Sequence, residues 1–245
     1  MKWKSHAAIT RAVCKELGVP EHYEEMIVDG AVEPDRNPVL VGRSTTKRLR
    51  VAHHGRSDRA TTVLLWKARA AYLDGDDEHA CRHLGRALHY IQDRCVSRCL
   101  SWHRHCLLEE RIMELAVPHG QVINGIRHSK SSPDFIRSCV KAIRPSSEPF
   151  SALAQATFYS AAIISSVLDG PDPPPSIEEM LRRSSIIRTI TLVTSAVSAT
   201  ILIFLALGSA GPLLLVLLII PAVSMAISER RYRSLIELAE WHGCL

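Results

Sequence analysis

This sequence lacks three features that would point to a secreted protein or to a β-sheet protein. No hydrophobic segment of the signal-peptide type precedes Trp3. The seven cysteines are odd in number and scattered, so we expect no disulfide framework and a reducing compartment such as the cytosol. No run of alternating strands occurs between Met1 and Pro145, and this predicts an all-α fold.

Charge is missing from most of the C-terminal region. Ile186 to Leu207 is apolar apart from Arg188 and scattered Thr and Ser, and Leu213 to Ile227 is apolar again. Because a membrane span needs about 20 residues, the two stretches predict a transmembrane hairpin. Arginines flank it on both sides and its turn carries no charge, so both flanks are expected in the cytoplasm. A hairpin inside a soluble core is disfavoured because Leu213 to Ile220 contains no polar residue.

The length of 245 residues permits one main domain with an appendage. We expect a helical-bundle metal-site domain over residues 1–170 and a proline-rich linker over 171–180. The transmembrane hairpin then covers 181–228, and an amphipathic tail over 229–245 lies on the membrane surface or against the domain. The helix expected from Ser151 to Leu168 contains many small residues and closes the bundle.

The central feature of the predicted bundle is a helix that contains Leu84 to Asp93, LGRALHYIQD, and opens near Asp76 and Asp77. His89 and Asp93 are four residues apart, so their side chains share one helix face. One such pair is more often a core histidine beside a carboxylate than a metal site. Gly85 lies on the same row one turn earlier, where another element can approach closely.

A second pair with the same spacing follows, formed by His105 and Glu109, and nine of the twelve histidines cluster between His53 and His128. This clustering favours a metal site. Around these pairs we expect a loop over residues 37–59 and further helices at about residues 5–17, 21–32, 61–73, 102–116 and 133–143.

The runs CRHLGRALHYIQD and HCLLE resemble the zinc-dependent phospholipase C family and the related single-strand nucleases. The resemblance covers roughly the first 115 residues, and its motifs follow the family order. Trp3 with His6 is similar to the family's N-terminal tryptophan and first histidine, and GAVEPD, Gly30 to Asp35, to its active-site aspartate segment. The arginine content would fit an archaeal form. The ligands that the resemblance implies are His6, Asp35, His53, His89, Asp93, His105 and Glu109.

Two positions depart from the family pattern. Cys99 stands where the family carries a histidine, so the third metal is held by Cys99, is held by His103, or is absent. Trp3 follows two other residues, so its α-amine is not free to bind metal, and the Trp3 carbonyl or a water remains as the ligand near His6.

The resemblance implies a hydrolase of phosphodiesters that uses two or three Zn²⁺ ions. Asp35 would be the catalytic proton acceptor, Asp93 would bridge two metals, and His54 and Arg56 would contact substrate. Tethering favours membrane phospholipid over nucleic acid as the substrate. The basic run from Gly42 to Arg50 suits either phosphate-bearing partner, or is a solvated loop. The alternatives are a nuclease-like phosphodiesterase with the same metals and a non-catalytic membrane scaffold that holds one structural zinc.

Overall fold

The computed structural model describes residues 1–36, 40–44, 47–50, 58–97, 101–170, 176–208 and 219–245. The chain divides into two compact units, Met1–Gly170 and Pro171–Leu245. Helices dominate both, which confirms the predicted all-α class. The elements are α1 (Trp3–Glu16), α2 (Glu21–Arg36), β1 (Leu40–Ser44), β2 (Lys47–Arg50), α3 (Asp58–Leu73), α4 (Asp77–Arg94), α5 (Trp102–Glu114), α6 (His119–His128), α7 (Pro133–Ala142), α8 (Pro149–Val167), α9 (Ile177–Gly208) and α11 (Ile219–Trp241).

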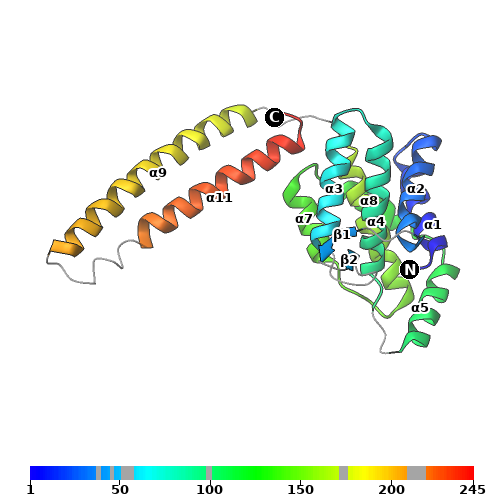
Figure 1. Cartoon of the computed structure of the whole chain (residues 1–245). Helices are drawn as coiled ribbons and strands as arrows, with labels where there is room; N and C mark the ends of the chain where they lie inside the picture. Colours follow the sequence, from blue (N-terminus) through cyan, green and yellow to red (C-terminus); the bar gives the residue numbers. More distant parts are fainter. Residues whose placement is uncertain (37–39, 45–46, 51–57, 98–100, 171–175, 209–218) are drawn as a thin grey trace. The chain divides into compact units, whose positions relative to one another are not determined.

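The first unit is built around α4 and α8 (Figure 1). The row Leu84, Leu88 and Ile91 of α4 is buried, as its helical periodicity predicts. With this face and its flanks α4 packs against α2, α3, α8 and α1. Helix α8 is lined by small buried residues such as Ala152 and Ala156, which let α6 and α4 approach it closely.

Several boundaries differ from the sequence-based expectation. Helix α1 begins at Trp3, with the extended Lys2 as its N-cap, and the expected cap Ser5 is buried inside it. Helix α2 continues through Pro34 to Arg36. In the segment that we expected to be a loop, β1 and β2 form an antiparallel hairpin. Its polar sequence lacks the apolar alternation that identifies strands. The short helix α6 was not predicted.

The second unit contains α9 and α11, which run antiparallel and side by side. Arg188 of α9 donates to Glu229 of α11 at 2.6 Å, and Ser195 donates to the Pro221 carbonyl at 3.3 Å. As the residue number rises along α9 it falls along α11, which is the register of a helical hairpin. Helix α11 is continuous through Trp241, so the expected separate tail is an extension of this helix.

Within the described part of the chain, two helices are long and apolar enough to cross a membrane, by length and composition, namely Pro149–Val167 and Ile177–Phe204. The first is α8, and 61% of its most apolar window is buried, as expected for a core helix of the bundle. In the most apolar stretch of α9 none of the residues is buried, and Ile190, Val193 and Ile201 are exposed there.

Candidate metal centre

Helix α4 carries the centre of the site. Asp76 caps the helix by accepting from the backbone N–H of His79, which fixes where the first turn begins. From that start His89 and Asp93 fall on the same buried face, and His89 Nε2 lies 3.4 Å from Asp93 Oδ2. The predicted stacking of this pair is therefore confirmed.

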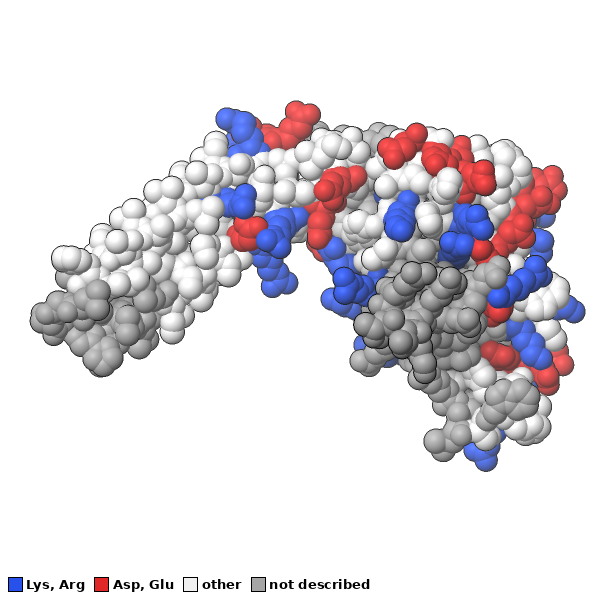
Figure 2. All heavy atoms as spheres, viewed as in Figure 1, with Lys and Arg blue, Asp and Glu red and all other residues white. Residues whose placement is uncertain are grey.

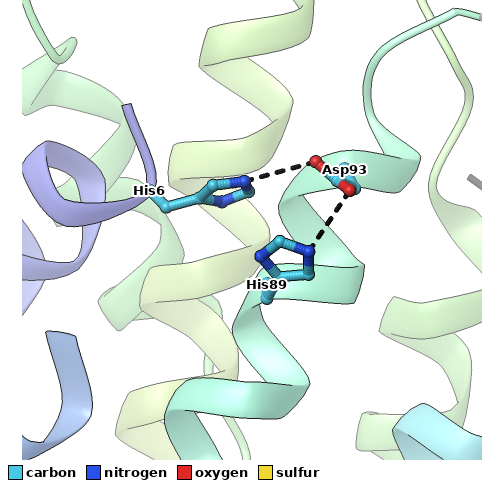
Figure 3. A group of neighbouring side chains, drawn as sticks. All are labelled: His6, His89 and Asp93. Carbon is cyan, nitrogen blue, oxygen red and sulfur yellow. Dashed lines mark ion pairs between the residues drawn. The ribbon is translucent and has the colours of Figure 1, made fainter. Parts of the chain in front are cut away.

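Helix α1 adds His6 to this pair. His6 lies on a buried row with Ile9 and Val13, and its Nε2 is 3.3 Å from Asp93 Oδ1. The two imidazole rings are 4.5 Å apart between centroids, and both face the Asp93 carboxylate from neighbouring helices (Figure 3). One donor atom from each of the three residues lies within 4.8 Å of the other two, so the group could hold a metal ion.

In each imidazole, Nδ1, the nitrogen that points away from Asp93, is held by a hydrogen bond. His89 Nδ1 lies 2.9 Å from the Ala31 carbonyl oxygen, which can only accept, so this nitrogen carries the proton. Burial, and then the nearby His6, lower the pKa of His89 to about 3, so the ring is neutral. Its Nε2 therefore directs a lone pair at the Asp93 carboxylate.

The same argument applies to His6 through Gln92. The Gln92 amide donates from Nε2 to Ser160 Oγ at 2.9 Å, so its Oε1 is the acceptor for His6 Nδ1 at 2.7 Å. His6 Nε2 then faces the Met1 carbonyl oxygen at 3.1 Å as well as Asp93. Such hydrogen bonds to the outer nitrogen are the usual means of orienting a metal-binding histidine.

Two glycines bring α2 close enough to supply the Ala31 carbonyl. A Cβ on Gly85 would lie 2.7 Å from the Ala31 nitrogen, and closer still to the Ile27 carbonyl oxygen. A Cβ on Gly30 would lie 2.8 Å from the Arg82 carbonyl oxygen. The close approach that Gly85 predicted is therefore found, and α2 is the element that makes it.

Met1 occupies the space that we assigned to Trp3. Trp3 is 56% exposed, whereas Met1 is buried, and its α-amine donates to Asp93 and lies 2.9 Å from Glu109 Oε1. Burial alone would lower the pKa of this amine, but the carboxylates of Asp93 and Glu109 outweigh it and the pKa is raised. The amine thus joins α4 to α5.

The second predicted pair lies on α5. Ser101 caps this helix through the Arg104 N–H, and His105 Nε2 is 3.2 Å from Glu109 Oε1. Both side chains are mostly buried, at 15% and 13% exposure. Through the Met1 amine, the second pair is connected to the first.

Asp35 borders the group. It lies in the last turn of α2, and its Oδ1 is 3.8 Å from His89 Nε2. Its side chain is 34% exposed, whereas that of Asp93 is 2% exposed. Asp35 is therefore placed to contact both the buried group and a molecule outside it.

Four predicted residues lie outside the described part of the chain, namely His53, His54, Arg56 and Cys99. The alternative ligand His103 is on the exposed side of α5. Sequence reasoning did not identify Gln92 or Ser160, because no local spacing connects either residue to His6. It also missed Met1, which contributes through its backbone groups.

The donor set fits a divalent cation. His6 Nε2, His89 Nε2 and the oxygens of Asp93 and Met1 converge in a buried space, where the Met1 ammonium group is the cation that pairs with Asp93. Imidazole nitrogen and carboxylate oxygen are common ligands of transition metals. Comparison with known proteins adds no name to this site, since no family model, curated protein or solved structure matches the chain.

Proposed function

We propose that the chain is a metal-dependent phosphodiester hydrolase of the phospholipase C type that acts at a membrane surface. The observation that carries the proposal is the convergence of His6 Nε2 and His89 Nε2 on the buried Asp93 carboxylate. The resemblance of CRHLGRALHYIQD and HCLLE to the zinc-dependent family supports it.

The proposed cofactor is Zn²⁺, in two or three copies. His6, His89 and Asp93 would hold one ion, with Asp93 shared by a second. The other ligands are assigned to Asp35, His105 and Glu109, together with His53 and either Cys99 or His103 by resemblance. When bound, such ions polarise phosphoryl oxygens and favour hydroxide near neutral pH.

The chain's own residues would orient and protect the reaction. Gln92 and the Ala31 carbonyl hold the two imidazoles in the orientation that directs Nε2 inward. Asp35, at the partly exposed border, would accept a proton from the attacking water, as the resemblance implies. His54 and Arg56 would contact the substrate phosphate.

Phospholipid is the proposed substrate because the same chain carries α9, which is long and apolar enough to cross a membrane. We propose that α9 and α11 span it as a hairpin with both flanks in the cytoplasm, since arginines lie on both flanks. The linked bundle would then meet lipid head groups at high local concentration.

An Asp35→Asn variant tests this function. Compared with the wild type at equal zinc content, it should lose at least about a hundredfold in hydrolysis of phosphatidylcholine vesicles, because a general base contributes about 10² to 10⁴ in rate. Asp29→Asn is the matched control, since Asp29 is exposed on the same helix and should leave the rate unchanged. A zinc-loaded wild-type protein that cleaves neither phosphatidylcholine nor single-stranded DNA would support the non-catalytic scaffold, and cleavage of DNA alone would support the nuclease.

A further inference from the structure

The charged residues of α9 and α11 end at positions that lie side by side in the hairpin. No Asp, Glu, Lys or Arg occurs from Thr189 to Ser228, and the residues that border this stretch, Arg188 and Glu229, are in contact at 2.6 Å. From Thr189 to Gly208, α9 is about 30 Å long, which matches the hydrocarbon thickness of a bilayer. In Figure 2 the charged residues of the hairpin gather at its base, and the described surface beyond them is uncharged.

Arginine dominates the charges at this boundary. We call the six arginines of the base the arginine collar. Only Glu179 and Glu229 accompany them between residues 179 and 233, so this stretch carries a net charge of +4, six positive minus two negative. The collar consists of Arg182, Arg183, Arg188, Arg230, Arg231 and Arg233.

The two glutamates pair with only part of the collar. Glu179 accepts from Arg182 and Arg183, and Glu229 accepts from Arg188 and Arg233. Each carboxylate is therefore shared by two guanidinium groups. Arg230 and Arg231 are exposed beside Glu229, with no ion pair among the described residues. The excess positive charge thus lies at the depth where lipid phosphates would lie.

We propose that the arginine collar binds the head groups of anionic phospholipids and enriches them around the hairpin. Guanidinium groups bind phosphate with two parallel hydrogen bonds, which ammonium groups do not match. Charge complementarity selects the anionic lipid over the zwitterionic one, because the choline cation cancels the phosphate charge. The proposal rests on the membrane hairpin of the proposed function but not on catalysis.

Spin-labelled lipids test it on the full-length protein in phosphatidylcholine bilayers. The motionally restricted fraction of labelled phosphatidylglycerol should exceed that of labelled phosphatidylcholine, with a relative association constant of about five or more at low salt, since one arginine near an anionic surface contributes about fivefold. Raising the salt to about 1 M shortens the Debye length to about 3 Å and should reduce the ratio.

Variants locate the effect. Arg230→Gln/Arg231→Gln should bring the ratio close to one, and Arg230→Lys/Arg231→Lys should give a ratio between that of the Gln variant and that of the wild type, because the charge remains but the paired hydrogen bonds are lost. Arg104→Gln/Arg111→Gln removes the same charge from exposed positions of the first unit and should leave the ratio unchanged. Equal restriction of both lipids by the wild type, or an equal fall of the ratio in the Gln and Lys variants, would contradict lipid binding by the arginine collar but not the membrane hairpin. Absence of any restricted lipid would overturn both.

Discussion

The α-amino nitrogen of Met1 lies 2.9 Å from Glu109 Oε1, although 108 positions separate the two residues. The same amine also donates to Asp93, so one buried cation neutralises two carboxylates from different helices. Removing one member of such a buried group leaves the others uncompensated.

Blocking this amine should therefore destabilise the protein. Acetylation of Met1 should cost the metal-free protein about 3 kcal/mol, because it removes the cation from two buried carboxylates. In a thermal melt this corresponds to a fall in Tm of roughly 6 to 12 °C. Lys2→Gln is the control, since Lys2 pairs with the exposed Glu110 and should change Tm little. An unchanged Tm after acetylation would contradict the assigned role of the amine.

The contact between Gly30 and Gly85 should be equally sensitive. Gly85→Ala places a methyl group against the backbone of α2 and should cost about 1 to 3 kcal/mol, the usual range for an overpacked core. It should also weaken metal binding, because the Ala31 carbonyl that orients His89 would move. Gly120→Ala meets nothing within 4 Å in a helix and should be neutral or stabilising. Equal Tm values for the two variants would argue against close packing at Gly85.

Glu33 should make stability depend on pH in the acid range. Hydrogen bonds from Arg86 at 2.5 and 2.7 Å, and then from Arg82, hold the pKa of Glu33 at about 2, although partial burial alone would raise it. Because the pKa of Glu33 is lower in the folded protein than in the unfolded chain, where it is about 4.3, the carboxylate stabilises the fold fully at pH values above about 4.3. This contribution falls as the pH drops toward 2. The free energy of unfolding of the wild type should exceed that of Glu33→Gln by about 1.5 kcal/mol at pH 6, and by less at pH 3. A difference that grows as the pH falls would contradict this.

The hairpin has its own test. A reporter fused after Leu245 and another inserted at Gly208 should lie on opposite sides of the membrane, because the charged flanks stay in the cytoplasm. Full-length protein should also resist extraction by alkaline carbonate. Reporters on the same side would rule out the two-span topology.

Local geometry explains which parts of the site were predictable. The spacing of His89 and Asp93 fixes their common face, and Gly85 one turn earlier predicts a close neighbour, because both follow from the helical repeat. The partner helix α2 and the convergence of His6 on Asp93 depend on tertiary packing. Spacing does not encode that packing, and only the family resemblance suggested His6.

Backbone groups were the main source of error. The resemblance directed attention to the α-amine and the carbonyl oxygen of Trp3, whereas Met1 contributes these two groups, which any residue at that position possesses. Similarly, the Ala31 carbonyl that orients His89 has no signature in the sequence. The β1–β2 hairpin was missed because its polar residues show no apolar alternation.

The central claim is that Asp93 organises a metal centre, and metal content measures it most directly. Full-length protein in detergent, loaded with zinc and then dialysed, should contain two or three zinc ions per chain by elemental analysis. Asp93→Asn, which keeps the shape of the side chain but removes its charge, should lose most of this zinc. Asp134→Asn is the control, because the Asp134 side chain is 80% exposed and should leave the content unchanged. Full zinc content in Asp93→Asn, or no zinc in the wild type, would contradict the account.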